Sequence, residues 1–276
     1  MAFNTANFAF RQVNYHATGD WGQACRTSRE HFSPIETFEA RFDDLMGEVD
    51  ALGFKNVELW HFHLHQKWWT PEHVQAARSV AARRGMQFVA YCGGFGDDLA
   101  EVERTLELVT ALGIPLLAGA SRMFTEQRRE YVARLRAYGV RFGYENHPEK
   151  TPQELLERAG PDEDGLVGVT VDTGWFGVQA YPADQAVREL GGRVLHVHLK
   201  DVLEVGTHQT VGYGQGVVPL RAVVDTLAAT QYRGYISMEH EPEQFDPADD
   251  LRASRLQLHS WLHALTGGPT PAPVVP

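Results

Sequence analysis

The feature of this sequence that most constrains its fold is a regular alternation of short apolar runs with longer amphipathic stretches. Each apolar run has the length of a buried strand, and the stretch after it has the period of a helix, often ended by a glycine. Such alternation favours a parallel sheet with right-handed crossovers. Strands are expected at residues 8–13, 56–60, 87–91, 115–119, 140–145, 166–172, 194–199 and 235–239.

The eight strand–helix pairs favour closure of the sheet into a barrel, and a chain of 276 residues has the usual size for one. No Gly-x-Gly-x-x-Gly motif follows the first strand, which argues against an open, dinucleotide-binding sheet. The sequence therefore predicts an α/β fold, a single-domain (β/α)8 TIM barrel over residues 1–266, with a Pro- and Gly-rich tail at 267–276. Residues 14–32 are expected to form a polar loop. Helices are expected at 34–52, 70–84, 97–112, 125–138, 151–159, 183–190, 218–230 and 246–265.

Charge and composition narrow the possible partners. The formal net charge of −11 argues against binding to nucleic acid or to an anionic membrane surface. No apolar run is long enough for a membrane span, and the N-terminus lacks the pattern of a signal peptide. Cys25 and Cys92 are too few for a disulfide framework. We expect a cytoplasmic protein that acts on a small molecule; whether it forms a homo-oligomer stays open.

Side chains of the kind that bind metals stand at the C-terminal ends of four successive strands: Glu145, Asp172, His198 and Glu239. The first three are one strand–helix repeat apart, and an extra loop at 202–215 lengthens the last interval. The C-terminal ends of barrel strands meet at one mouth, so these side chains are expected to converge. Three carboxylates and one imidazole suit one divalent metal ion, Mn²⁺, Mg²⁺ or Co²⁺, and Zn²⁺ is compatible with them.

Further polar residues lie near the expected mouth. Lys200 could polarise a substrate oxygen or form a structural ion pair with Glu58. His147 follows a ligand and could act as an acid or base, or support the ligands from behind. Three histidines alternate after the second strand, which leaves open either a second metal or ordinary loop histidines: His61, His63 and His65.

Aromatic residues are frequent in the loops on the ligand side. Such rings stack on the C–H faces of sugars and exclude water, although they could also form a loop core or a dimer contact. No Gly-rich phosphate cradle and no basic cluster accompanies them, so a phosphorylated substrate is not expected. The aromatic residues concerned are Trp60, Trp68, Trp69, Phe95, Trp175 and Tyr213.

These motifs resemble the xylose isomerase-like TIM-barrel superfamily, in its sugar phosphate isomerase/epimerase branch. The similarity spans the chain to about residue 265. It is carried by Glu58 in Val57-Glu58-Leu59-Trp60, Glu145 in Tyr144-Glu145-Asn146-His147, Asp172 in Val171-Asp172-Thr173-Gly174, the run His198-Leu199-Lys200-Asp201, the run Gly212-Tyr213-Gly214, and Glu239.

The resemblance implies a metal-dependent isomerase or epimerase acting on a keto-sugar or polyol derivative. Glu145, Asp172, His198 and Glu239 would hold one ion, which binds a substrate carbonyl and an adjacent hydroxyl. Glu145 and Glu239 would transfer protons on opposite faces through an enediolate. The catalytic candidates are Glu145, Glu239, Lys200 and His147, and the substrate-binding candidates are Glu58, Trp60, Trp175, Lys200 and Tyr213.

The sequence departs from the epimerase pattern in two places. Trp175 stands where those relatives usually carry a histidine, and no arginine occurs at 202–205. The alternative is therefore a lyase with the same metal site, either an inosose-type dehydratase or an enzyme that cleaves 3-keto-glycosides. A DNA-repair nuclease like endonuclease four is opposed by the acidic charge, and a sugar-binding barrel without activity stays open.

Overall fold

Parallel strands close into a barrel in which β10 pairs with β1, as predicted. The computed structural model describes residues 1–265, so the predicted tail lies outside the described residues. Neighbours around the barrel run in the order β1, β2, β3, β4, β5, β6, β7 and β10. The bounds are β1 Ala2–Asn4, β2 Asn56–Trp60, β3 Gln87–Gly94, β4 Leu116–Ala120, β5 Arg141–Glu145, β6 Val167–Asp172, β7 Val194–Leu199 and β10 Ile236–Met238.

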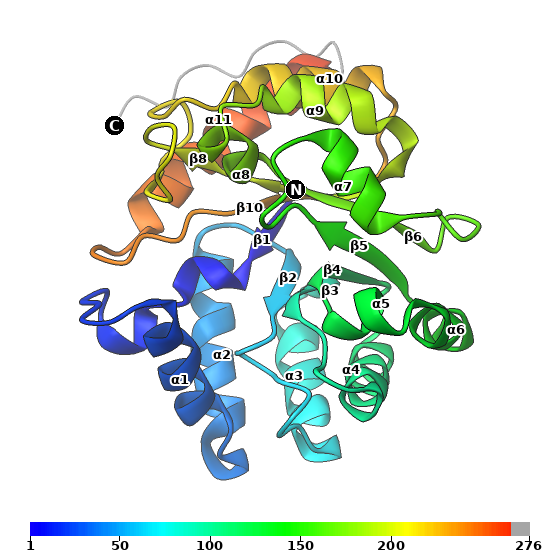
Figure 1. The fold of residues 1–276 in the computed structure, drawn as a ribbon. Helices are drawn as coiled ribbons and strands as arrows, with labels where there is room; N and C mark the ends of the chain where they lie inside the picture. The colour runs from blue at the N-terminus through cyan, green and yellow to red at the C-terminus, as the bar shows by residue number, and fades with distance from the viewer. Residues whose placement is uncertain (266–276) are drawn as a thin grey trace.

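Helices surround the strands on all sides (Figure 1), and each of the eight predicted helices is present with small shifts at its ends. Their buried stripes explain the packing: in the helix at Ile35–Ala51, Leu45, Met46 and Val49 are fully buried. These helices are α2 Ile35–Ala51, α3 Pro71–Arg83, α4 Leu99–Leu112, α6 Arg128–Tyr138, α7 Pro152–Ala159, α9 Ala183–Leu190, α10 Leu220–Ala229 and α11 Ala248–Leu265. None of the helices in residues 1–265 combines the length and apolar character needed to cross a bilayer.

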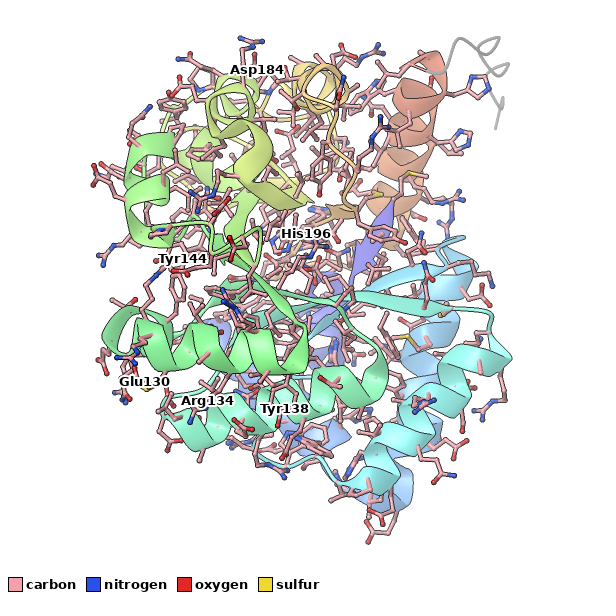
Figure 2. All side chains as sticks on the ribbon, turned by 90° about the vertical axis from the view of Figure 1, so that its right-hand side faces the viewer. Glu130, Arg134, Tyr138, Tyr144, Asp184 and His196 are labelled. Atoms are coloured by element: carbon pink, nitrogen blue, oxygen red, sulfur yellow. The ribbon has the colours of Figure 1, made fainter. Side chains whose placement is uncertain are left out.

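The barrel interior is where polar side chains become buried. Every residue of β6 is buried, including the aspartate at its end. Figure 2 shows His196 of β7 in the middle of the molecule, whereas Glu130, Arg134 and Tyr138 follow α6 along the outside. His196 is 1% exposed, so its imidazole needs partners inside the barrel.

The prediction of a first strand at 8–13 is wrong. That segment forms 3-10 turns at Thr5–Phe8 and Arg11–Val13, and the strand is Ala2–Asn4. Phe3 pairs with Val57 of β2 and with Met238 of β10. The alternation at 8–13 arose because Phe8 and Phe10 are both buried against the core, which a turn achieves as well as a strand.

The expectation of a loop at 14–32 is also wrong, because α1 occupies Trp21–Phe32. The carboxylate of Asp20 accepts a hydrogen bond from Gly22 N, which caps the helix. Ala24, Ser28 and Phe32 form its buried face. A stripe this narrow, in a segment that is otherwise polar, gives little periodic signal.

Three smaller features were not predicted. Helix α5, Arg122–Glu126, splits the helix expected at 125–138, and α8, Thr173–Val178, follows β6 directly. The extra loop after β7 contains a hairpin of β8, Asp201–Val202, and β9, Thr210–Val211. The Asp201 carboxylate holds this region because it accepts hydrogen bonds from four backbone N–H groups, those of residues 202, 214, 216 and 218.

Candidate metal centre and substrate cavity

A cavity of about 490 Å³ opens at the C-terminal ends of the strands. Most of the predicted site residues line it: Glu145, His147, Trp60, Trp175, His198, Lys200 and Glu239. Asp172, Glu58 and Tyr213 are not among the described residues of this lining. They lie behind it, as the contacts of each show.

His198 is the centre of the first group of metal-type side chains. Its Nδ1 lies 2.5 Å from Glu145 Oε1 and 3.3 Å from Glu239 Oε2. The pairing of strands produces this arrangement, because His198 is opposite Asp172 of β6 and Ser237 of β10. Glu145 ends β5, and Glu239 directly follows β10. The ligand atoms of Glu145, His198 and Glu239 lie within 4.8 Å of one another, which is compatible with one metal ion.

Asp172 belongs to a second, overlapping group with Glu145 and His147. Its Oδ2 lies 3.0 Å from His147 Nε2 and 3.1 Å from Lys200 Nζ. Its Oδ1 accepts a hydrogen bond of 3.1 Å from Trp175 N, at the start of α8. The four predicted ligands therefore lie around one mouth in two groups that share Glu145, with Asp172 held by neighbouring side chains.

Glu58 lies inside the barrel behind His198 and is fully buried. Its two oxygens accept hydrogen bonds from His196 Nε2 at 2.9 Å and from His198 Nε2 at 3.0 Å. Both ring nitrogens of His198 therefore face carboxylate oxygens, and Glu58, Glu239 and Glu145 raise the pKa of His198 well above its usual value although burial opposes the charge. A metal ion would replace the proton on Nδ1, while Glu58 keeps the proton on Nε2. His196 was missed in the sequence, although its spacing of two residues from His198 places both on the same face of β7.

Lys200 extends into the acidic cluster. Its ammonium lies 3.1 Å from Asp172 Oδ2, 3.3 Å from Glu239 Oε2 and 3.0 Å from Glu241 Oε2. Burial opposes the charge of Lys200, but these carboxylates outweigh it and raise its pKa well above the usual value. Its ion-pair partners are these three carboxylates rather than Glu58, the partner considered from the sequence.

The electrostatics of the cavity favour a bound cation. Among the described lining residues, Lys200 is the single lysine or arginine beside several carboxylates. Burial raises the pKa of Glu239 well above its usual value, and its Oε2 is buried without a hydrogen bond. Burial also opposes ionisation of Glu145, but the charges of His147 and His198 lower its pKa. A divalent ion fits this donor set, since it supplies the missing positive charge and takes carboxylate oxygen and imidazole nitrogen ligands.

Aromatic rings line the cavity from two sides, with Trp60 at the end of β2 and Trp175 after β6. Trp60 and Trp175 line it as predicted, and Trp21 of α1 joins them, with its ring centroid 5.9 Å from that of Trp60. Tyr213 instead donates a hydrogen bond of 2.6 Å to Leu199 O, and its ring stacks on Trp261. The contacts of Tyr213 are therefore with the end of β7 and with α11, not with the cavity.

The histidines of the loop after β2 do not converge. His63 Nδ1 lies 3.0 Å from Thr5 Oγ1 inside the protein, while the rings of His61 and His65 lie side by side with centroids 5.0 Å apart. None of the three belongs to a metal-compatible group within residues 1–265.

Other cavity residues were missed in the sequence. Glu241 and Glu243 line the mouth, and His208 reaches it from the β8–β9 hairpin, 3.9 Å from the Trp175 ring centroid. Glutamates alternate at 239, 241 and 243, and this pattern could have indicated Glu241 and Glu243. His208 gave no such signal because the hairpin that carries it was not predicted.

Fold and site together define a class of (β/α)8 barrels, those in which carboxylates and imidazoles that could hold a metal ion gather at the C-terminal mouth. Within that class, a family model described as the xylose isomerase-like TIM barrel matches residues 47–261, more than half of the sequence. The chain belongs to this family.

Comparisons with individual proteins extend this result. An uncharacterized protein of Mycobacterium leprae is 26% identical over 154 residues, which cover 54% of this chain. The chain spans about half the length of that curated relative.

Solved structures share the fold at low sequence identity. A crystal structure of the IolI protein with bound zinc is 14% identical, with a TM-score of 0.67 over 96% of this chain and 98% of the other. A D-allulose 3-epimerase from Methylomonas sp., in complex with D-allulose, is 17% identical, with a TM-score of 0.61 over 94% and 95%. A 3-keto-D-glucoside 4-epimerase from E. coli is 19% identical, with a TM-score of 0.58 over 79% and 94%.

Proposed function

We propose that this protein is a divalent-metal-dependent isomerase or epimerase that acts on a keto-sugar or polyol derivative. The observation that carries the proposal is the approach of Glu145 and Glu239 to the same imidazole nitrogen, with Glu239 Oε2 buried and without a hydrogen bond. Names of similar structures agree with it: a D-allulose 3-epimerase and a 3-keto-D-glucoside 4-epimerase are among them.

The proposed metal ligands are Glu145, Asp172, His198 and Glu239. A divalent ion held there would supply the positive charge that stabilises a negative oxygen developing on the substrate. Mn²⁺, Mg²⁺ and Co²⁺ are the proposed ions, and Zn²⁺ suits the same donors.

Proton transfer is the task of the two glutamates. They come from β5 and from the end of β10, with β6 and β7 between them in the barrel. One glutamate removes the proton next to the substrate carbonyl, and the other returns a proton from its own side. Return at the same carbon inverts that centre, whereas return at the neighbouring carbon isomerises the sugar. Lys200 lies 3.3 Å from Glu239 and His147 lies 3.9 Å from Glu145, so each positions one of the two glutamates.

The cavity is suited to a neutral, hydroxyl-rich substrate. Its single lysine is already engaged by three carboxylates, so no free cation is available for a phosphate. The indole rings of Trp21, Trp60 and Trp175 offer flat apolar faces to sugar C–H groups.

The test is proton exchange in deuterated water, followed by NMR on a panel of keto-sugars that includes D-allulose and methyl 3-keto-β-D-glucoside. We expect exchange next to the carbonyl with Mn²⁺ present and its loss with excess chelator. Glu239→Gln should abolish exchange. Glu103→Gln should not change it, because this glutamate contacts Arg134 and Tyr138 of α6 and does not line the cavity.

The products separate the possible outcomes. A product of unchanged mass supports the isomerase or epimerase. A product that lacks water or an aglycone would replace it by the lyase, which needs the same proton abstraction. Absence of exchange from the whole panel in metal-loaded protein would refute the proposal.

A further inference from the structure

A second depression adjoins the cavity, between the loop after β2 and the ends of β3 and β4. We call it the imidazole cleft; its volume is about 350 Å³, and His61 and His65 line it. His61 also lines the main cavity, so one ring forms the boundary of both. Either space alone has the size of a small-molecule site, roughly 300–1,000 Å³.

Glycines keep the boundary between the two spaces low. Gly93 lines the cavity and Gly94 the imidazole cleft. A Cβ on Gly93 would lie 2.4 Å from His61 Cδ2, and its φ of +128° disfavours any side chain. The His61 ring can therefore lie directly against the end of β3, where it lines both spaces.

The hydrogen bonds of the two imidazoles determine what the imidazole cleft can bind. His65 Nδ1 accepts from Lys67 N at 3.0 Å, so the neutral ring carries its proton on Nε2. His61 Nδ1 lies 3.1 Å from Gly94 O and 3.4 Å from Gly94 N; the shorter contact, to an oxygen that can only accept, places the proton on Nδ1 and leaves Nε2 as an acceptor. Neither Nε2 makes a hydrogen bond within residues 1–265. Burial lowers the pKa of His61 well below the usual value and that of His65 to about 4, which keeps both rings neutral.

The charged residues of the imidazole cleft are already paired. Lys67 lies 3.2 Å from Asp97 and 3.1 Å from Glu101, and Arg122 lies 3.6 Å from Glu126. A phosphate or carboxylate would have to break these pairs. One open donor and one open acceptor, beside the apolar rings of Phe62 and Phe95, match a neutral sugar ring with its hydroxyls.

We propose that the imidazole cleft is a second subsite, which holds the distal hydroxyl-bearing ring of a two-ring neutral substrate while the keto-bearing ring lies in the main cavity. The inference rests on the proposed function for the position of the reacting ring. It assigns the substrate to the class of keto-disaccharides and related keto-glycosides. It also gives His61 and His65 a role as hydrogen-bonding residues for hydroxyl groups.

Binding is measured first, with sugars that lack the ketone and cannot react: lactose, maltose and methyl β-D-glucoside, each titrated into Mn²⁺-loaded protein by ligand-observed NMR. We expect at least one disaccharide to bind more tightly than the methyl glucoside. His65→Ala should weaken that disaccharide by about two- to tenfold, the value of one uncharged hydrogen bond, and leave the methyl glucoside within twofold. His259→Ala removes an imidazole from the exposed face of α11 and is the matched control.

A second variant fills the imidazole cleft rather than removing a contact. Ala120 is the exposed last residue of β4 and lines the cleft. Ala120→Trp should abolish the preference for the disaccharide even if each imidazole contributes little. Equal affinity for one-ring and two-ring sugars in the wild type, or a preference that survives both variants, would overturn the inference.

Exchange kinetics on 3-keto-lactose and methyl 3-keto-β-D-glucoside then separate this inference from the proposed function. A higher kcat/KM for the disaccharide that falls in His65→Ala supports both. A disaccharide binding preference without any exchange supports the subsite and refutes the proposed reaction. Exchange that does not distinguish the two substrates refutes the subsite and leaves the reaction intact.

Discussion

Replacing Glu58 with glutamine tests how His198 is prepared to bind a metal. Glu58 is fully buried, and it accepts one hydrogen bond from the Nε2–H of His196 and one from the Nε2–H of His198. Glutamine has one acceptor oxygen, and its NH₂ group is a donor. One imidazole must therefore lose its partner or change tautomer. If His198 changes, its Nδ1 carries the proton and no longer offers a lone pair to the ion.

The expected magnitude follows from these two bonds. A hydrogen bond to a charged group contributes about 1.5–3 kcal/mol and a neutral one about 1 kcal/mol. Loss of such a partner behind a metal ligand typically weakens metal binding by about 10–100-fold. We expect the Kd of Mn²⁺ to rise by about tenfold or more in Glu58→Gln, which is about 1.4 kcal/mol or more.

Isothermal titration calorimetry of chelator-treated protein with Mn²⁺ measures this change. Glu48→Gln is the control, because Glu48 forms an ion pair with Arg11 and contacts neither His196 nor His198. Circular dichroism establishes that each variant is folded. An unchanged Mn²⁺ affinity in folded Glu58→Gln would show that Glu58 does not set the tautomer of His198, and the reasoning would be wrong.

Further predictions concern charge, pH and the hairpin. Lys200→Met removes an ammonium that lies 3.1 Å from Asp172 and 3.3 Å from Glu239. The variant should bind Mn²⁺ about fivefold more tightly, a gain of about 1 kcal/mol, because the ammonium repels the ion. Weaker Mn²⁺ binding in calorimetry would contradict this. Burial lowers the pKa of His65 to about 4 from 6.5. As the pH falls, His65 is therefore protonated in the unfolded chain before it is protonated in the folded protein. The free energy of unfolding is unaffected by His65 above pH 6.5 and decreases as the pH falls below that value. At pH 5 the loss is about 2 kcal/mol. Urea unfolding of His65→Gln should show a smaller fall between pH 7.5 and 5 than the wild type, and an equal fall would refute the assignment. Asp201→Asn leaves one acceptor oxygen for four backbone N–H groups and should lower the free energy of unfolding by about 1–3 kcal/mol. Limited proteolysis should then cleave residues 203–217 faster than in the wild type. An unchanged cleavage rate would count against this role of Asp201.

The barrel could be predicted because its signals are local. Buried parallel strands such as Val194–Leu199 are short apolar runs, and helices such as Ala183–Leu190 show a buried stripe and a glycine at the end. The prediction failed where a strand depends on tertiary contacts and its sequence carries no local pattern. The three-residue strand Ala2–Asn4 forms only because β2 and β10 pair with it on both sides.

The candidate site divides in the same way. The structure brings Glu145, His198 and Glu239 into one group and Asp172 with Glu145 into another, because parallel strands end at the same side of a barrel. The roles of their supports could not be predicted. Glu58 lies behind His198 instead of facing the cavity, and Trp21 and His208 arrive from segments that were expected to be loops.

The sequence by itself determined the alternation of strands and helices, and with it which side chains stand at the strand ends, since both depend on residues a few positions apart. The tertiary structure alone decided which atom of each side chain meets which partner. Closure of the barrel brings residues more than a hundred positions apart into hydrogen-bonding distance, as for Glu58 and His198. Orientation, protonation and the second cleft follow from that closure, because burial and neighbouring charge are properties of the folded chain.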